Sequence, residues 1–528
     1  MEMERHFMRT SPTASRNGKR IVSLVAAAAL AVGLAGCTDG GGGEPPADVP
    51  RVLKVGTSAA LTSLDPALSA TPGVAFLTPV YEALILRDPE GLLQPGLATE
   101  WELSDDATQL ELQLREGVEF QDGAPFDADA VKANLDAAPT RGGQIASQLA
   151  TVTDVEVIDE HRVRLTMSRP ASDILGVLAS EAGMMISPAA LGSADLGTKP
   201  VGTGPFTVEK QNQTGITYVA WDGYWNKDRI KLDRIEILTG LNDDQTRLNA
   251  VLTGEIDVAQ TRYTQIPEQE QRAPDTVTSI TGNRATVVGI MLNTGAGQWA
   301  NPAMRMAAMH AIDRQGISDA LYDGGCEAVA QPYPTSYWAS DPKLEKSDAA
   351  AYDPDLAREL LEKAGLVGTK VTLYVGAATL YQNMAAAVQN QLNTVGMDVS
   401  VESLDTATLS DLRSRGEFEA SIALVNSARP DPAQFVQQFY APDGVFNYGD
   451  YLFDGIQKPL AAMNATSDQD ERAGYMHEIM KQVLEQGPTM IPICAPTDAV
   501  MYNSALGGIS IPVNYDNDWT YAYFTGGK

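Results

Sequence analysis

The order of apolar and polar residues predicts short strands and one helix in the first third of the chain. Apolar and polar positions alternate at residues 109–115, and further runs at 152–158 and 162–167 flank a short turn. Asp127 can accept a backbone hydrogen bond as the N-cap of a following helix. Together these elements predict a small α+β unit at residues 86–186.

Later in the chain the spacing of apolar residues is in some segments typical of a strand and in others typical of a helix. Residues 371–375 and 398–403 have strand composition, and a longer helical pattern at residues 381–393 lies between them. Strand, helix and strand in this order are typical of an α/β domain, which we place at residues 284–495. Strands, a glycine turn and a helix at residues 199–258 predict a further α/β domain before it.

Two longer helices are predicted from apolar spacing and from capping residues. Residues 74–86 carry apolar side chains at helical spacing. Asn301 and Pro302 supply an N-cap and a first-turn proline for a helix that we expect to continue to residue 321. Both helices would run for more than three turns.

Length and charge limit the classes of protein and partner. The 528 residues suggest two to four domains of about 150 residues each. Apolar residues make up 44% of the chain and charged residues 20%, as in a globular protein. The formal net charge of −30 would repel nucleic acid and anionic lipid headgroups. No nucleic-acid partner is therefore expected.

Residues 1–36 have the composition of a secretory signal peptide. A positively charged segment precedes an apolar run at residues 21–35. The basic residues of this segment are Arg5, Arg9, Arg16, Lys19 and Arg20. A helix over the apolar run would span roughly 22 Å, short of the ~30 Å hydrocarbon core of a membrane. A cleaved signal is therefore favoured over a permanent membrane anchor.

The apolar run ends in the sequence LAGC at Cys37, which resembles the lipobox of bacterial lipoproteins. The resemblance implies that Cys37 is lipidated and becomes the mature N-terminus. The alternative is a small-residue cleavage site that happens to precede a cysteine. Residues 37–50 are rich in glycine and suit a flexible tether. We therefore expect an extracytoplasmic protein anchored to the cell membrane through its lipid.

Two further cysteines, Cys326 and Cys494, follow in the chain. An even pair in an exported protein favours a disulfide, which here would close a long loop. The alternative is two thiols that are buried separately. Spacing alone does not choose between them, because it does not give their distance.

The sequence contains no pattern typical of catalysis, metal binding or cofactor binding. The motifs HExxH, GxSxG and CxxC are absent. The four histidines are far apart in the sequence: His6, His161, His310 and His477. The turn VGTGPF lacks the third glycine and the following helix of a dinucleotide site. We expect no enzymatic activity, no metal and no cofactor, and a secreted hydrolase is disfavoured.

Motifs distributed along the chain resemble those of one family of transport proteins. They occur in the order SLDP at 63, YEALI at 81, PGLATEWELSDD at 95, LREGVEFQDGAPFDADAV at 114, VGTGPF at 201, GYWN at 223, LDRIEI at 232, GEID at 254, AIDR at 311, YDPDLARELLEKAG at 352 and RPDP at 429. Together they resemble the extracytoplasmic solute-binding proteins of the dipeptide, oligopeptide and nickel group, family 5, which serve ABC importers. The resemblance covers nearly everything from Arg51 to Lys528.

The resemblance implies an α/β, two-lobed, type II periplasmic-binding-protein-like fold with mixed sheets, a hinge and a small inserted third domain. Solute would bind between the lobes, which close over it. The resemblance also implies a monomer that works with the permease subunits of an ABC importer. The expected organisation is a signal peptide at 1–36, a tether at 37–50, lobe I at 51–85, 187–283 and 496–528, the inserted domain at 86–186, and lobe II at 284–495.

One position departs from the pattern of the peptide-binding relatives. They commonly carry an acidic residue three positions before a DP pair, where it holds the α-amino group of the ligand. Here the pair is Asp431 and Pro432, and the equivalent position is Ala428, followed by Arg429. Without the acid an ammonium group would lose a charge-assisted hydrogen bond, and Arg429 would repel it. The alternatives are a shifted alignment of this loop or another acid with the same role.

Other candidate ligand residues follow from the resemblance and from residue type. Arg413 lies where oligopeptide binders carry an arginine, and it could meet a carboxylate or be an exposed helical arginine. Tyr381 begins a helix that faces the cleft in relatives, although it could instead pack against its own lobe. Asn426 and Ser427 complete the candidates on the hinge side.

A proline-broken loop carries Tyr333, Tyr337 and Trp338. Aromatic residues in such loops can bind ligand, or they can cover a core. The resemblance also places the loop that contains Thr71 at the wall of the cleft. We add these four residues to the candidate ligand site.

These observations predict a lipoprotein that delivers a small solute, a peptide or peptide-like compound, to an ABC importer by hinge closure. A non-peptide cargo of the same transporter class, such as a sugar, an opine or a metal chelate, is an alternative. A lipoprotein that senses peptides without transport would share this sequence.

Overall fold

The computed structural model describes residues 50–69, 73–141, 143–241, 243–262, 266–426, 431–442, 444–514 and 517–526. By its internal contacts the chain divides into two units, residues 1–48 and 49–528. The described helices and strands belong to the second unit. Within these ranges no helix is both long and apolar enough to span a membrane.

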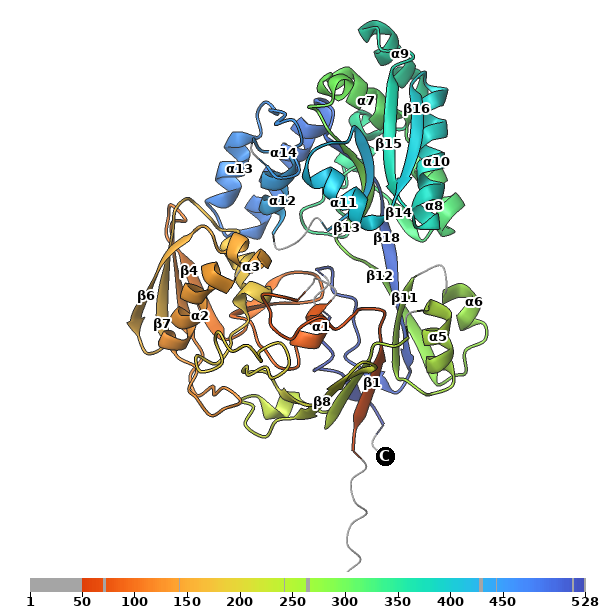
Figure 1. Ribbon diagram of the computed structural model, residues 1–528. Helices are drawn as coiled ribbons and strands as arrows, with labels where there is room; N and C mark the ends of the chain where they lie inside the picture. The colour runs from red at the N-terminus through yellow and green to blue at the C-terminus, as the bar shows by residue number, and fades with distance from the viewer. Residues whose placement is uncertain are drawn as a thin grey trace, which may run out of the picture. The chain divides into compact units, whose positions relative to one another are not determined.

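One long mixed sheet runs through the second unit (Figure 1). Its strands follow the order β16, β15, β17, β13, β18, β11, β1, β10, β9 and β8, and β12 and β14 also pair with β18. The fourteen-residue strand β18 (Met490–Asn503) pairs with β13 and β14 at its start and with β11 and β12 at its end. Because β18 is shared, it divides the sheet into two halves.

The second half contains the β-α-β unit that the sequence predicts. Strand β15 (Lys370–Gly376) pairs in parallel with β16 (Asp398–Leu404), and α10 (Thr379–Thr394) connects them. Strand β15 also pairs in parallel with β17 (Ala420–Asn426), which lies antiparallel to β13 (Thr286–Leu292). We call β13 to β17 with helices α7 to α14 the second half. The α/β prediction is confirmed here.

The first half is also α/β. Strand β1 (Val52–Gly56) lies in parallel between β10 (Arg234–Leu238) and β11 (Val258–Arg262). Strands β8 (Phe206–Asn212) and β9 (Gly215–Ala220) extend the sheet in antiparallel pairing. Apolar residues of β1 and β10 are fully buried, which fixes the register of these central strands.

A separate four-stranded sheet forms the inserted unit. Its order is β4 (Ala98–Leu103), β5 (Gln109–Leu114), β7 (Arg162–Met167) and β6 (Val152–Asp159). Helices α2 (Ala128–Arg141), α3 (Gly143–Gln148) and α4 (Ile174–Leu178) complete the unit, and α4 shares its core. The alternating runs in the sequence are confirmed as strands, while the domain boundaries stay predictions.

The two longer helices are shorter than predicted. Helix α1 covers only Val74–Leu77, because Pro79 has no amide hydrogen to continue it. The helix predicted up to residue 321 is two helices, α7 (Pro302–Ala311) and α8 (Arg314–Tyr322). Asp313 separates them, since its side chain accepts a hydrogen bond from Gly316 as the N-cap of α8.

The remaining elements connect or flank these sheets. The strands are β2 (Ile85–Arg87), β3 (Leu93–Pro95), β12 (Val277–Asn283), β14 (Cys326–Ala328), β19 (Leu506–Gly507) and β20 (Tyr523–Phe524). The α-helices are α5 (Asp244–Leu252), α6 (Ile266–Glu270), α9 (Pro354–Ala364), α11 (Thr406–Ser414), α12 (Pro432–Phe439), α13 (Gln457–Asn464) and α14 (Gln469–Glu485). Short 3-10 helices are η2 (Glu181–Gly183), η3 (Lys227–Arg229), η5 (Gly297–Ala300), η6 (Leu344–Lys346) and η7 (Asp348–Ala350).

Candidate solute-binding cleft

The parallel strands of the second half end at one edge of the sheet. Strands β15, β16 and β17 end at Gly376, Leu404 and Asn426. Helices α10, α11 and α12 follow them along the chain within a few residues. In open parallel sheets, ligands bind outside the carboxyl ends of the strands, where loops and helix starts gather. This edge is therefore one wall of a candidate site.

The parallel strands of the first half supply a second such edge. Strands β1, β10 and β11 end at Gly56, Leu238 and Arg262. Helices α5 and α6 follow β10 and β11 in the chain, and the Asp243 side chain caps α5 by accepting from Thr246. The same physical rule makes this edge a second wall.

The register of β18 brings the two walls together. Val288 of β13 lies opposite Cys494, whereas Arg262 at the end of β11 lies opposite Asp498. Asn426 at the end of β17 lies opposite Thr286, the first residue of β13. The carboxyl ends of both sets of parallel strands therefore lie near the middle of β18. The pairing therefore places the two edges at the same stretch of β18, and we call the region between them the candidate cleft.

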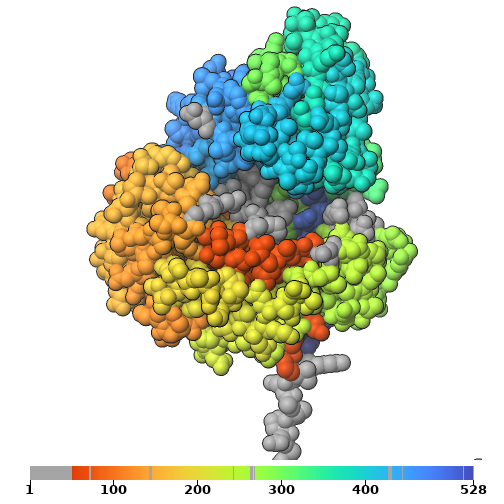
Figure 2. All heavy atoms as spheres, viewed as in Figure 1, coloured from red at the N-terminus to blue at the C-terminus, as the bar shows by residue number. Residues whose placement is uncertain are grey.

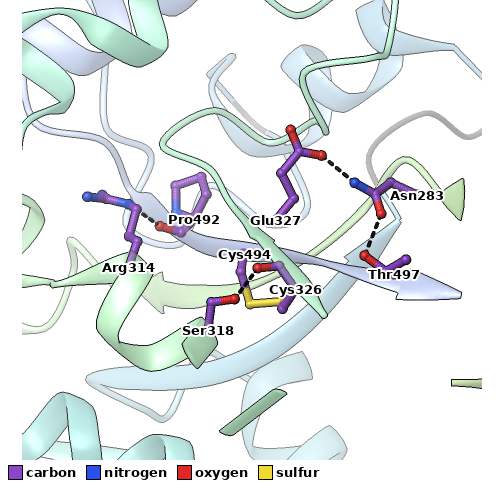
Figure 3. The surroundings of a disulfide bond; sticks show 8 residues. All are labelled: Asn283, Arg314, Ser318, Cys326, Glu327, Pro492, Cys494 and Thr497. Carbon is purple, nitrogen blue, oxygen red and sulfur yellow. Dashed lines mark hydrogen bonds between the residues drawn. A yellow bond between two sulfur atoms is a disulfide. The ribbon is translucent and has the colours of Figure 1, made fainter. Parts of the chain in front are cut away.

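Polar contacts hold the segments that cross between the halves (Figure 3). Asn283, at the end of β12, accepts a hydrogen bond from the Thr497 hydroxyl at 2.7 Å and donates to the Glu327 carboxylate. The next residue, Arg284, is 2% exposed, pairs with Asp498 and donates to the carbonyl of Pro512 at 2.9 Å. The crossing points are thus ordered by side chains rather than by pairing alone.

A disulfide lies close to where β18 and the connection from β12 to β13 pass from one half to the other, which we call the crossing point. Cys326 of β14 is bonded to Cys494 of β18, with a Cα–Cα distance of 5.5 Å (Figure 3). The adjacent residue, Glu327, also accepts from the backbone amide of Thr335 at 3.0 Å. The bridge therefore joins β14 covalently to the strand shared by both halves.

The inserted unit contacts the second half through buried polar groups. Figure 2 shows the inserted unit, in orange, against the blue residues that include α12 to α14. Ser172 donates its amide to the carbonyl of Asn464 at 2.9 Å and its hydroxyl to that of Met463 at 3.0 Å. Arg472 of α14 donates to the Ser172 hydroxyl and pairs with Asp431. One arginine thus links both sides of the contact.

The neighbouring Asp173 is 2% exposed. Gln434 and Arg169 donate to one of its carboxylate oxygens at 3.2 and 3.3 Å. Burial raises the pKa of Asp173, and the charge of Arg169 opposes the rise. Because the Asp173 carboxylate is buried, its charged form depends on contact with Arg169 and Gln434.

A cavity of about 370 Å³ lies beside this contact. Trp101 and Leu175 line it from the inserted unit, and Tyr337 and Trp338 line it from the second half. Arg87 of β2 and the buried pair of Asp431 and Arg472 are its charged lining residues. We call it the aromatic cavity.

Comparison with known proteins identifies the family. The model of "Bacterial extracellular solute-binding proteins, family 5 Middle" matches residues 93–447. The chain belongs to this family. Its members are binding proteins of ABC importers, so the predictions of family, of extracytoplasmic solute binding and of no enzymatic activity are confirmed.

Similar proteins of this family bind different solutes. The glutathione-binding protein GsiB of Salmonella paratyphi A is 29% identical over 458 residues, which cover 83% of this chain and 87% of GsiB. Helicobacter pylori DppA, solved with the peptide STSA, has a TM-score of 0.73 at 23% identity, covering 90% and 98% of the two chains. Campylobacter jejuni NikZ, solved with Ni(L-His), has a TM-score of 0.73 at 20% identity, covering 90% and 100%. The solved structures confirm the predicted fold.

Two predicted ligand residues of this family-5 chain lie at the carboxyl edge of the second half. Tyr381 is the third residue of α10 and is partly exposed there. Asn426 is the last residue of β17. The other predicted cleft residues, Thr71, Ser427 and Arg429, and also Ala428, lie outside the described residues, as does Cys37. Their roles stay predictions.

The remaining predicted ligand residues lie elsewhere. Arg413 donates to the Ser421 hydroxyl at 2.7 and 3.0 Å, so it braces β17, and burial lowers its pKa. Tyr333 is fully buried and stacks on Tyr337 with ring centroids 5.1 Å apart. In this arrangement Tyr333 packs in the core of the second half, because its loop folds inward. Tyr337 and Trp338 line the aromatic cavity instead of a strand end.

Sequence reasoning missed Trp101, Arg87 and Arg472 of this cavity. Trp101 occupies one position of the four-stranded sheet, and its sequence context does not distinguish it from other sheet residues. Arg472 lies among the acidic residues that begin α14, where an exposed ion pair is the usual expectation. Only the tertiary contact of the inserted unit with α14 shows their positions.

The structure explains why two distant family motifs occur together. Glu82 of YEALI is buried and accepts hydrogen bonds from the Tyr224 hydroxyl at 2.7 Å and the Trp225 indole at 2.9 Å, both in GYWN. Burial raises the pKa of Glu82 to about 7, and these hydrogen bonds and the charge of Arg115 oppose the rise. The motifs therefore form one buried polar contact in the first half.

The raised pKa predicts a pH dependence of stability. Between its ordinary pKa of 4.5 and about 7, Glu82 binds a proton in the folded state that it lacks in the unfolded state. The free energy of unfolding should therefore fall as pH rises through this window, by about 3 kcal/mol. Glu82→Gln should remove this part of the slope in urea unfolding at pH 5 and pH 8. The exposed control Glu116→Gln should keep the wild-type slope. If the free energy of unfolding of Glu82→Gln changed with pH as much as that of the wild type, the prediction would be wrong.

Proposed function

We propose that this protein captures a small solute, a peptide or peptide-like compound, in the cleft and delivers it to an ABC importer by hinge closure. The observation that carries the proposal is the meeting of both sets of parallel strand ends at β18 and at the crossing from β12 to β13. Two walls joined by few crossing segments can approach and separate. A solute that contacts both walls would favour the closed arrangement.

The cargo class is narrowed by Ala428 and Arg429. Without an acid at position 428, a free α-amino group in the cleft would be desolvated without a partner. The favoured cargo therefore has carboxylate, hydroxyl or blocked N-terminal groups. The relatives GsiB and NikZ are described with glutathione and Ni(L-His), so non-peptide or modified peptide cargo is within the range of the family.

Thermal shift tests this proposal. Mass spectrometry first identifies any solute that copurifies, and a panel then compares free peptides, N-acetylated peptides, sugars, opines and metal chelates. A solute at a hundredfold excess over its Kd should stabilise the protein by about 2.7 kcal/mol. N-acetylated peptides should shift the melting temperature at least as much as free ones. Binding that N-acetylation abolishes would show that another acid holds the amine.

A variant pair makes the test of position 428 specific. Ala428→Asp should raise the affinity for free peptides relative to N-acetylated ones, because it supplies the missing carboxylate. Ala428→Asn introduces a side chain of nearly the same shape as aspartate but without its charge, and it should leave the relative affinity unchanged. An equal response of both variants would mean that position 428 does not meet the ligand.

We further propose that Cys37 carries the membrane anchor. Full-length protein expressed with its signal should partition into detergent as a lipidated form that begins at Cys37. Cys37→Ala should abolish lipidation and release the protein from membranes, measured by phase partition and by mass spectrometry of the N-terminus. Unchanged attachment of Cys37→Ala would contradict the lipobox assignment.

A further inference from the structure

The aromatic cavity uses residues other than those at the strand ends of the cleft. Its volume of about 370 Å³ is within the range of small-molecule sites, about 300–1,000 Å³. Trp101 of the inserted unit and Trp338 of the second half are both only partly buried. Tyr337, 4% exposed, packs against Trp338 with ring centroids 5.6 Å apart. The two sides of the cavity thus both present aromatic surface.

The polar lining carries an excess of positive charge. Its charged side chains are those of Arg87, Arg472 and Asp431, two guanidinium groups and one carboxylate. Arg87 is held in place by donating to the carbonyls of Gly176 at 2.6 Å and Ala179 at 3.0 Å. In a chain of net charge −30, a concave site with this balance favours an anion over a cation.

We propose that the aromatic cavity is a second ligand site, which binds a small aromatic carboxylate. The ring would lie between Trp101 and the pair of Tyr337 and Trp338, where aromatic rings pack favourably. The carboxylate would face Arg87, whose planar fork of donors matches it. The site is additional to the solute cleft and does not depend on the proposed cargo.

Occupation of the cavity would favour contact between the inserted unit and the second half. The ligand would touch Trp101 on one side and Trp338 on the other, so it would bind more tightly when the two sides are together. Asp431 lines the cavity and also caps α12. Strand β17, which precedes α12 in the chain, ends at the cleft. A ligand here and a solute in the cleft would therefore increase each other's affinity.

Titration of the full-length protein with 4-fluorobenzoate, followed by fluorine NMR, tests the site without knowledge of the cargo. Saturable binding is expected, and uncharged 4-fluorobenzamide should bind at least tenfold more weakly. Trp101→Ala and Trp338→Ala, which alter opposite walls, should each weaken 4-fluorobenzoate binding at least tenfold. Trp221→Ala, a partly buried tryptophan outside the cavity, is the matched control and should bind like wild type.

Each outcome decides the proposal. Loss of binding in the folded variants of either wall, with binding kept in Trp221→Ala, supports it. No saturable binding by the wild type, or binding undiminished in both wall variants, overturns it. Melting curves establish which variants fold, and two walls keep the test available if one variant does not. Failure here leaves the thermal-shift test of the cleft unaffected, so the two proposals fail separately.

Discussion

Replacing Arg472 with methionine is expected to lower the free energy of unfolding by about 3–5 kcal/mol. Arg472 is 5% exposed, and its partner Asp431 is 9% exposed. Methionine keeps an unbranched apolar chain at this position but leaves Asp431 as a buried carboxylate without its cation. Because Arg472 also donates to Ser172, part of the loss should appear as separation of the inserted unit from the second half.

Urea unfolding measures the loss, and small-angle scattering detects separation as an increased radius of gyration. The matched control is Arg415→Met, since Arg415 is 54% exposed and pairs with Asp411 and Glu417 at the surface. Exposed pairs contribute little, so the control should unfold like wild type. Asp431→Asn added to Arg472→Met should recover part of the stability. Equal unfolding of Arg472→Met and Arg415→Met would mean that the buried pair does not stabilise this contact.

The central elements of the fold could be predicted because their signals are local. The alternation at residues 109–115 and the strand, helix and strand around α10 follow from side-chain periodicity alone. The helix ends depend on single residues, which periodicity does not show. Pro79 ends α1 early and Asp313 starts a new helix, although the apolar pattern continues through both positions.

The walls of the site could be predicted only in part. Tyr381 lies near a strand end, since helix starts after parallel strands gather there, but its contact with ligand stays a prediction. Tyr333 is the opposite case, because a proline-broken loop can carry its aromatic side chain inward as well as outward. No sequence signal distinguishes these directions. Besides its neighbour Tyr337, Tyr333 contacts the ring of Phe435, which is about a hundred residues away in the chain.

The pairing of β18 with both halves likewise depends on long-range contacts. The sequence predicts a strand at the apolar run that ends in Cys494, and a return of the chain to the first domain after it. It does not show that one strand continues without interruption from Met490 to Asn503. That continuity places Cys494 and Asp498 on the same strand, on either side of the crossing point.

The disulfide should therefore contribute both to global stability and to order at the crossing point. Cys326→Ser with Cys494→Ser is expected to lower the free energy of unfolding by about 2–4 kcal/mol. The bridge joins residues 168 positions apart, and closing so long a loop restricts the unfolded chain strongly. The native effect should be local, because β14 pairs with β18 over only a few residues, Cys326 to Ala328.

Three measurements separate these effects. Thiol counting on unfolded, unreduced wild-type protein should find Cys326 and Cys494 oxidised, and two free thiols would contradict the bridge. Urea unfolding then gives the global loss of stability. A control Ser504→Ala should not show this loss, since Ser504 is exposed. Hydrogen exchange should accelerate at β14 and at the facing residues of β18. Without the bridge, β14 is held by its short pairing with β18 and by the hydrogen bonds of Glu327 to Asn283 and Thr335, so this segment should open more often. If exchange there stays at the wild-type rate, the disulfide contributes to global stability but does not order this segment. The polar contacts would then be what keeps the segment ordered.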